Sequence, residues 1–194
     1  MTSGTKVLRG LFLLARGRAA GMADFANTSN SLTASIAPLI AFPLVGALLL
    51  IMKGDVTDGL ISFTAQLCVA LAPALITYEF ARRWGREDVW LRTASALNWS
   101  FWMILPLLML AAALGAMLVS LGVHDNIAEA MMIAVMGCYV MWLHWFIVRT
   151  GLNIGGWQAV LLVIVTNVAV GLLALGPDLI DMAMGGKMTI FLPG

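Results

Sequence analysis

Long apolar runs separated by short polar connections dominate this chain. A helix needs about 20 consecutive, mostly apolar residues to cross the hydrocarbon core of a bilayer. Five runs meet that requirement, and each is bounded by glycine, asparagine or charged residues: 34–52, 60–80, 96–121, 130–148 and 157–175. The runs are longer than strands and lack period-two alternation, so they indicate helices. The pattern predicts an all-α membrane protein built as a bundle of five transmembrane helices.

The five spans divide the chain into three parts. A basic arm, 1–33, precedes the transmembrane domain, 34–175, and a weakly amphipathic tail, 176–194, follows it. A helix over 6–20 would have one broad apolar face and one basic face. This predicts an amphipathic interfacial helix, attracted to anionic lipid headgroups on the membrane surface. Docking of the same helix on the bundle is the alternative. The tail is expected to rest on the opposite surface.

Composition supports this class of protein. The chain is 61% hydrophobic and 11% charged, with a mean hydropathy of +0.96, whereas soluble domains carry about 25% charged residues. The net charge of +1 gives no overall field that would favour a nucleic-acid partner. Cys68 and Cys138 both lie inside apolar runs, which does not favour a disulfide scaffold or a zinc site.

The basic residues are distributed unevenly between the connections. Lys53 and Lys187 lie on one side of the bundle, and nine lie on the other: Lys6, Arg9, Arg16, Arg18, Arg82, Arg83, Arg86, Arg92 and Arg149. Cytoplasmic loops are enriched in Lys and Arg, so the N-terminus is predicted to be cytoplasmic and the C-terminus periplasmic. All seven tryptophans fall near the cytoplasmic side in this topology, at headgroup depth, where indole rings are favoured.

The same side holds the candidate site for a partner or ligand. Its members are Glu79, Arg82, Arg83, Asn98, Trp99, Trp102, Trp142, His144 and Trp145. Glu79 is followed at helical spacing by Arg82 and Arg83, which favours an ion pair at the end of the second span. A carboxylate that relays protons or ions is the alternative for Glu79.

His144 lies near the inner end of the fourth span. Histidine is a common ligand of haem and metals and a proton shuttle, but the only other histidine, His124, lies on the opposite side. We therefore predict no cofactor or metal and expect His144 to hydrogen-bond to a neighbouring helix. Other polar residues at lipid depth are expected either to bond between helices or to line a small hydrophilic path: Thr64, Gln66, Asn98, Ser100, Thr166 and Asn167.

Two short stretches, Ser35–Leu44 in the first span and Ala81–Glu87 in the basic loop, carry a resemblance to a known family. With the basic arm, five spans and short loops, they resemble the Yip family of Rab-GTPase-interacting membrane proteins, in particular its small alphaproteobacterial relatives. The Asp-Leu-Tyr-Gly-Pro signature of the eukaryotic members does not occur in this sequence. The resemblance implies a non-enzymatic, multi-pass protein of the bacterial inner membrane, and it implies no catalytic residues.

The leading functional hypothesis is a scaffold, adapter or accessory subunit of a larger membrane complex. The sequence has no phosphate-binding loop, metalloprotease motif or nucleophile elbow. Its partners would be the bilayer and either another membrane protein or further copies of the chain. One alternative is a small oligomeric transporter or channel, with a path formed by Glu79, Asn98, His144 and Asn167. The other is a quinone- or redox-associated subunit, with a pocket near Trp99, Trp102, His144 and Trp145.

Overall fold

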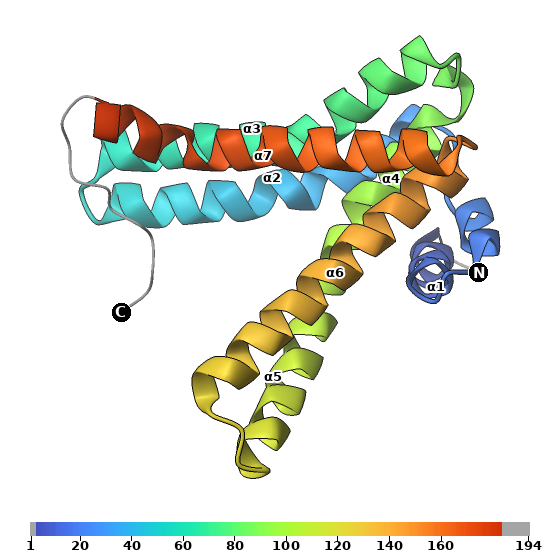
Figure 1. The fold of residues 1–194 in the computed structure, drawn as a ribbon. Coiled ribbons are helices and arrows are strands. Elements are labelled where there is room, and N and C mark those ends of the chain that lie inside the picture. The colour runs from blue at the N-terminus through green and yellow to red at the C-terminus, as the bar shows by residue number, and fades with distance from the viewer. Residues whose placement is uncertain (1–2, 184–194) are drawn as a thin grey trace.

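The computed structural model describes residues 3–183, and every regular element in that range is a helix (Figure 1). Five helical segments are long and apolar enough to cross a bilayer. They are Ser29–Met52, Gly59–Arg83, Glu87–Ser120, Asp125–Gly151 and Gly156–Gly176. These segments contain or closely match the five predicted runs, which confirms a multi-pass helical membrane protein. Most of the predicted tail lies outside the described residues.

The elements follow one another with short connections. The N-terminal half contains α1 (Ser3–Ala15), the 3₁₀ helix η1 (Ala19–Asp24), α2 (Ser29–Met52) and α3 (Val56–Arg83). The remainder contains η2 (Glu87–Val89), α4 (Trp90–Ser100), η3 (Phe101–Met103), α5 (Ile104–Ser120), α6 (Asp125–Gly151) and α7 (Gly156–Ala183).

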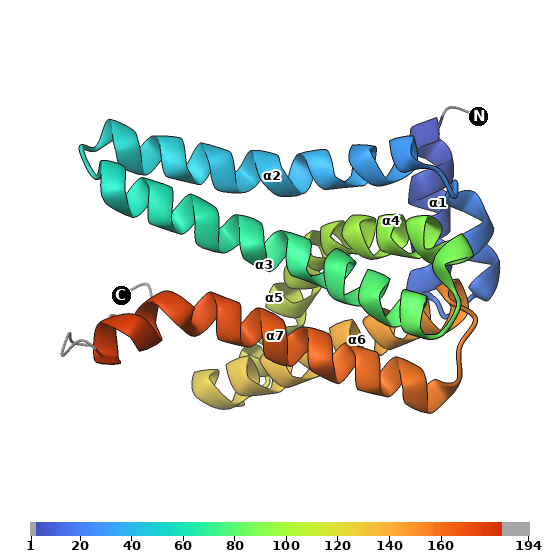
Figure 2. The same cartoon turned by 90° about the horizontal axis from the view of Figure 1, so that it is seen from above.

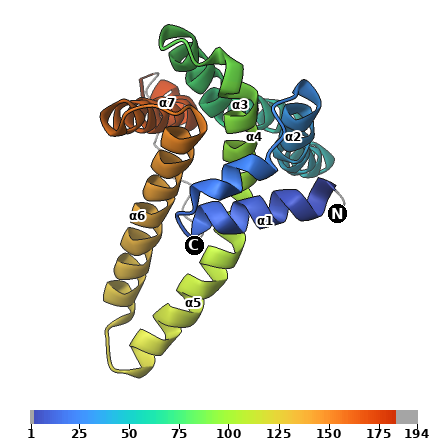
Figure 3. The same ribbon diagram turned by 90° about the vertical axis from the view of Figure 1, so that its right-hand side faces the viewer.

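The spanning helices form two arms that diverge from a common end. In one arm, α3 lies between α2 and α7 and packs against both (Figures 1 and 2). The other arm is the hairpin of α5 and α6, which runs away from the first at a wide angle (Figures 1 and 3). The two arms meet where α1, η1, the α3–α4 connection and the α6–α7 turn lie, and we call this the basic end. It holds all nine of the clustered Lys and Arg residues.

The third span is one helical segment, Glu87–Ser120, which closely matches the helix predicted over 96–121 and contains a short 3₁₀ turn. Within it, α4 is followed by the short η3 and then by α5. Pro106 has no N–H to donate to the carbonyl of Trp102, four residues earlier, and its ring crowds that carbonyl. Proline is tolerated in the first turn of a helix, so α5 restarts at Ile104 with Pro106 inside its first turn. This 3₁₀ turn separates α4, at the basic end, from the diverging α5.

The N-terminal arm docks on the bundle through α1. Leu11 and Leu14 are buried, and the hydroxyl of Tyr139 on α6 donates to the last carbonyl of α1 at 2.7 Å. Leu8 and Phe12 remain exposed. The structure therefore shows the docked arrangement, with a second apolar strip left exposed. The docked side chains share a core with Met22, Phe25, Ala96, Leu143 and Ile147.

An ion pair and two glycines hold α1 against η1. The guanidinium of Arg9 donates to both carboxylate oxygens of Asp24, at 2.9 and 2.5 Å. These bonds hold the pKa of Asp24 below its usual range, so the carboxylate stays ionised at neutral pH. A Cβ atom on Gly21 would lie 2.5 Å from the carbonyl oxygen of Gly10. The two segments therefore cross too closely for any larger residue at this point.

Candidate functional site

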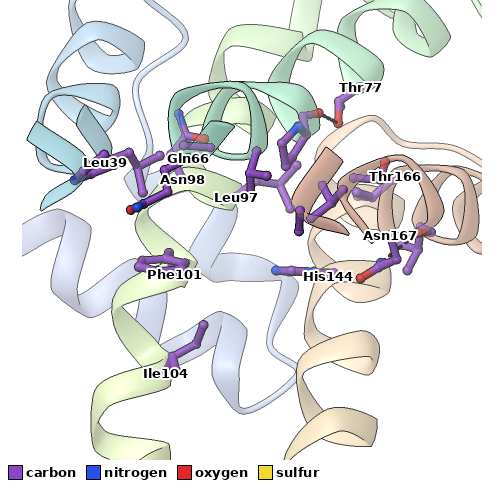
Figure 4. Close-up of a pocket in the computed structure, with 18 of the residues that line it drawn as sticks. Leu39, Gln66, Thr77, Leu97, Asn98, Phe101, Ile104, His144, Thr166 and Asn167 are labelled. Carbon is purple, nitrogen blue, oxygen red and sulfur yellow. Dashed lines mark hydrogen bonds between the residues drawn. The ribbon is translucent and has the colours of Figure 1, made fainter. Parts of the chain in front are cut away.

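A cavity of about 550 Å³ lies where the two arms diverge (Figure 4). It is bounded by α2, α3 and α7 on one side and by α4, η3, the start of α5 and α6 on the other. Its walls are mainly apolar, and its volume is typical of small-molecule sites. The polar residues that line it are Gln66, Thr77, Asn98, His144, Thr166 and Asn167.

A row of hydrogen bonds between α2 and α4 positions one wall of this cavity. Ser31 and Ser35, four residues apart on α2, lie on one helical side, and Asn27 precedes the N-cap residue Thr28. The side-chain oxygen of Asn27 accepts an N–H from the first turn of α4 at 3.0 Å. The hydroxyls of Ser31 and Ser95 lie 3.1 Å apart, and Asn98 Nδ2 donates to Ser35 Oγ at 3.0 Å. Such bonds between membrane helices fix their relative register.

The hydrogen bonds determine how two amide side chains are oriented. Ser35 donates its hydroxyl proton to the carbonyl of Leu32 at 2.6 Å, so its oxygen accepts from the nitrogen of Asn98. Asn167 donates to the carbonyl of Val163 at 2.8 Å, and a carbonyl can only accept. In both amides the nitrogen is therefore used within the protein. The side-chain oxygens have no hydrogen-bond partner in the described part of the chain.

His144 lines the cavity from α6 and is half-buried. Its ring extends from α6 toward the side on which Phe101 lies (Figure 4). Contrary to the expected bond to a neighbouring helix, the imidazole has no hydrogen-bond partner within residues 3–183. The next residue, Trp145, donates from Nε1 to the carbonyl of Gly156 at 3.1 Å, which ties α6 to α7. The backbone that carries His144 is therefore fixed while its polar ring atoms stay available.

Two prolines add further acceptors beside the cavity. Pro43 in α2 and Pro73 in α3 have no N–H, so the carbonyls of Leu39 and Val69, four residues earlier, lose their helical donors. All four residues line the cavity. Membrane helices tolerate such freed carbonyls where they face protein or a cavity. The cavity therefore combines an apolar wall with oxygen acceptors on two helices of one arm.

Glu79 lies outside this cavity. Its carboxylate bonds to Arg82 at 2.8 Å and to Arg83 at 2.9 Å, all three on the last turns of α3. The predicted ion pair is confirmed. Of the four residues proposed for a transport path, Asn98, His144 and Asn167 line the cavity, and Glu79 is not among its lining residues.

The tryptophans of the predicted site lie in several different places. Trp142 stacks on Phe146 with ring centroids 5.6 Å apart, and Trp99 packs against the core that holds α1. Trp102 lies 5.5 Å from the ring of Phe42, between α2 and η3. Trp145 and Trp102 therefore connect different helices, whereas the stack of Trp142 on Phe146 lies within α6. Of the nine predicted residues, Asn98 and His144 line the cavity.

The residues that hold Asn98 in position by hydrogen bonds were not predicted from the sequence. A signal was present, because Ser31 and Ser35 are four residues apart, and Ser95 and Asn98 are three apart. Both spacings put polar groups on one helical side. Polar stripes of this kind, at the start of two apolar segments, indicate a helix–helix seam.

The fold and cavity define a multi-pass helical membrane protein with a pocket inside its transmembrane region. Comparison with known proteins found no matching family model, no matching curated protein and no matching solved structure. The resemblance to the Yip family therefore stays a prediction. The function has to be inferred from the geometry of the chain itself.

Proposed function

We propose that this chain is a non-enzymatic accessory or adapter subunit of a larger complex in the bacterial inner membrane, with its N-terminus in the cytoplasm. The observation that supports this role is the isolation of the α5–α6 hairpin. None of the described residues of α5 is buried, and its main neighbours are α6 and η3. The outer surface of α5 exposes large apolar side chains, and apart from α6 and η3 no helix of the described residues packs extensively against it.

The proposed occupant of this surface is a transmembrane helix of a different membrane protein. Interfaces between membrane helices form by close packing of apolar surfaces. Two copies of this chain would bring two basic ends together, and each holds nine Lys and Arg residues against four Asp and Glu residues. A partner helix with acidic residues on its cytoplasmic side would complement that charge instead.

The orientation is testable with reporter fusions along the chain. We expect a reporter to be cytoplasmic at residue 88 and periplasmic at residues 56, 126 and 190, because Lys and Arg concentrate on the cytoplasmic side. Residue 190 lies outside the described residues, so this fusion also tests the predicted end of the fifth span. Paired phosphatase and fluorescent-protein fusions give opposite signals on the two sides. A cytoplasmic signal at residue 190 would contradict the five-span topology.

The partner is testable by crosslinking in living membranes. A photoreactive amino acid at Met109 on α5, which is 77% exposed, is expected to form one discrete adduct of higher mass. The matched control is Leu172 on α7, which is 60% exposed but lies on the other arm. The captured protein should contain an apolar transmembrane helix followed by acidic cytoplasmic residues when identified by mass spectrometry. An adduct of twice the chain mass, or equal adducts from both positions, would contradict the proposal.

A further inference from the structure

We propose that the cavity between the arms binds a neutral lipid that carries a hydroxyl head group and a long hydrocarbon tail. The hydroxyl would donate to the unpartnered oxygens of the cavity wall, and the tail would extend between the arms. The proposal concerns the cavity and not the hairpin surface, so it is independent of the accessory role.

The polar groups of the wall select for a ligand that supplies an O–H. The side-chain oxygens of Asn98 and Asn167 accept no hydrogen bond within the described chain, and the carbonyls of Leu39 and Val69 lose the donors four residues later to Pro43 and Pro73. Acceptors that stay unpaired within the hydrocarbon region are costly, because no water is there to pair with them. A hydroxyl satisfies one of them and also accepts a hydrogen bond in return, for which the imidazole of His144 is available. Ethers and esters have no O–H and would leave these acceptors unpaired.

The absence of charge on the wall excludes an ionic head group. No Asp, Glu, Lys or Arg is among the residues that line the cavity in the described chain. A phosphate or carboxylate would therefore lose its hydration without gaining a counter-charge. The same argument disfavours a bound metal ion, since no three His, Cys, Asp or Glu side chains gather within residues 3–183. The chemistry that fits is a neutral alcohol.

The shape of the cavity provides for the tail. Val170 and Ala174 continue the wall about one and two helical turns beyond Asn167 on α7, which corresponds to roughly 10 Å of helix. Ala65 and Val69 form the facing wall on α3. The side chains of these residues are apolar, so a hydrocarbon chain entering from the bilayer gains apolar contact with them. The polar head and apolar tail of the ligand therefore match two regions of one cavity.

The test uses the full chain in lipid nanodiscs and tritiated farnesol, a prenyl alcohol, as the probe. Farnesol is expected to bind about tenfold more tightly than farnesyl methyl ether, which has the same chain but no donor. Dioleoylglycerol and a ubiquinol analogue are then tested as competitors of farnesol. Stronger competition by the first indicates an acyl lipid as the ligand, and stronger competition by the second indicates a prenyl quinol. Equal affinity for the alcohol and the ether would overturn the proposal. Thermal stabilisation by Na⁺ or K⁺ but not by farnesol would indicate a cation site and overturn it as well.

Two substitutions test separately the region of the cavity that binds the hydroxyl head group and the region that binds the hydrocarbon tail. His144→Phe is expected to weaken binding of farnesol at least threefold, because it removes the donor to the ligand oxygen, whereas His124→Phe, at the other end of α6, should leave binding unchanged. Ala174→Phe should weaken binding of farnesol more than binding of geraniol, a shorter prenyl alcohol, because it fills the tail region only. Equal effects of the two histidine substitutions, or equal effects of Ala174→Phe on both alcohols, would contradict the assignment of the two regions.

Discussion

Replacing Leu14 with alanine is expected to release α1 from the bundle. Leu14 is fully buried in the core shared by α1, η1, α4 and α6. Removal of a buried leucine side chain costs about 2–5 kcal/mol, because apolar contacts are lost and a cavity remains. Alanine is a better helix former than leucine, so α1 itself should stay helical and only its docking should weaken. The docking free energy is the quantity that changes.

Hydrogen exchange of the α1 amides in nanodiscs measures this free energy. Because each 1.4 kcal/mol is a factor of ten, we expect exchange in Leu14→Ala to be about 30-fold faster or more. Leu8→Ala is the matched control, since it makes the same chemical change on the same helix at a position that is 68% exposed. If Leu8→Ala speeds exchange as much as Leu14→Ala, then the lipid surface rather than the bundle holds α1. That outcome would favour the interfacial helix expected from the sequence.

The spans could be predicted because lipid imposes a simple requirement on the sequence. Every residue exposed to hydrocarbon has to be apolar over about 20 residues, whatever the neighbouring helices do. The helix ends were less well predicted. Helix α2 begins at Ser29 and α6 extends over Asp125–Gly151, beyond the apolar runs 34–52 and 130–148 on which they were recognised. Polar residues continue a helix into the headgroup region, where water and lipid headgroups solvate them.

The cavity could be predicted only in part. Asn98, His144 and Asn167 were recognisable as polar residues at lipid depth, but a single sequence does not say which helix sides meet. Their meeting depends on the 3₁₀ turn η3, where α5 begins to diverge, and on the hydrogen bond that fixes Ser35 against Asn98. The apolar pattern could not indicate that turn, because Phe101–Met103 are as hydrophobic as α5, which follows them. The packing of the helices against one another, which a single sequence does not reveal, therefore determines which polar residues line the cavity.

The close approach of α4 and α6 connects the stability of the fold to the geometry of the cavity. Asn98 is on α4 and His144 is on α6, so their separation depends on how these two helices cross. At the crossing, Gly151 of α6 lies directly against the fully buried Thr93 of α4. A Cβ atom on Gly151 would lie 2.5 Å from Oγ1 and 2.7 Å from Cγ2 of Thr93. The hydroxyl of Thr93 also donates to the carbonyl of Val89 at 3.0 Å, which limits its freedom to turn away.

Gly151→Ala is therefore expected to lower the free energy of unfolding by about 1–3 kcal/mol, the usual cost of overpacking. Gly137→Ala on the same helix is the matched control, because a Cβ atom there would have no neighbouring atom within 4 Å and alanine favours the helix. Steric-trapping measurements of unfolding in detergent give the comparison. The double variant Gly151→Ala with Thr93→Ala should recover most of the loss, since it removes the two closest atoms. Equal stability of the Gly151 and Gly137 variants would show that α4 and α6 do not cross this closely. The positions of Asn98 and His144 in the wall of the cavity would then be wrong.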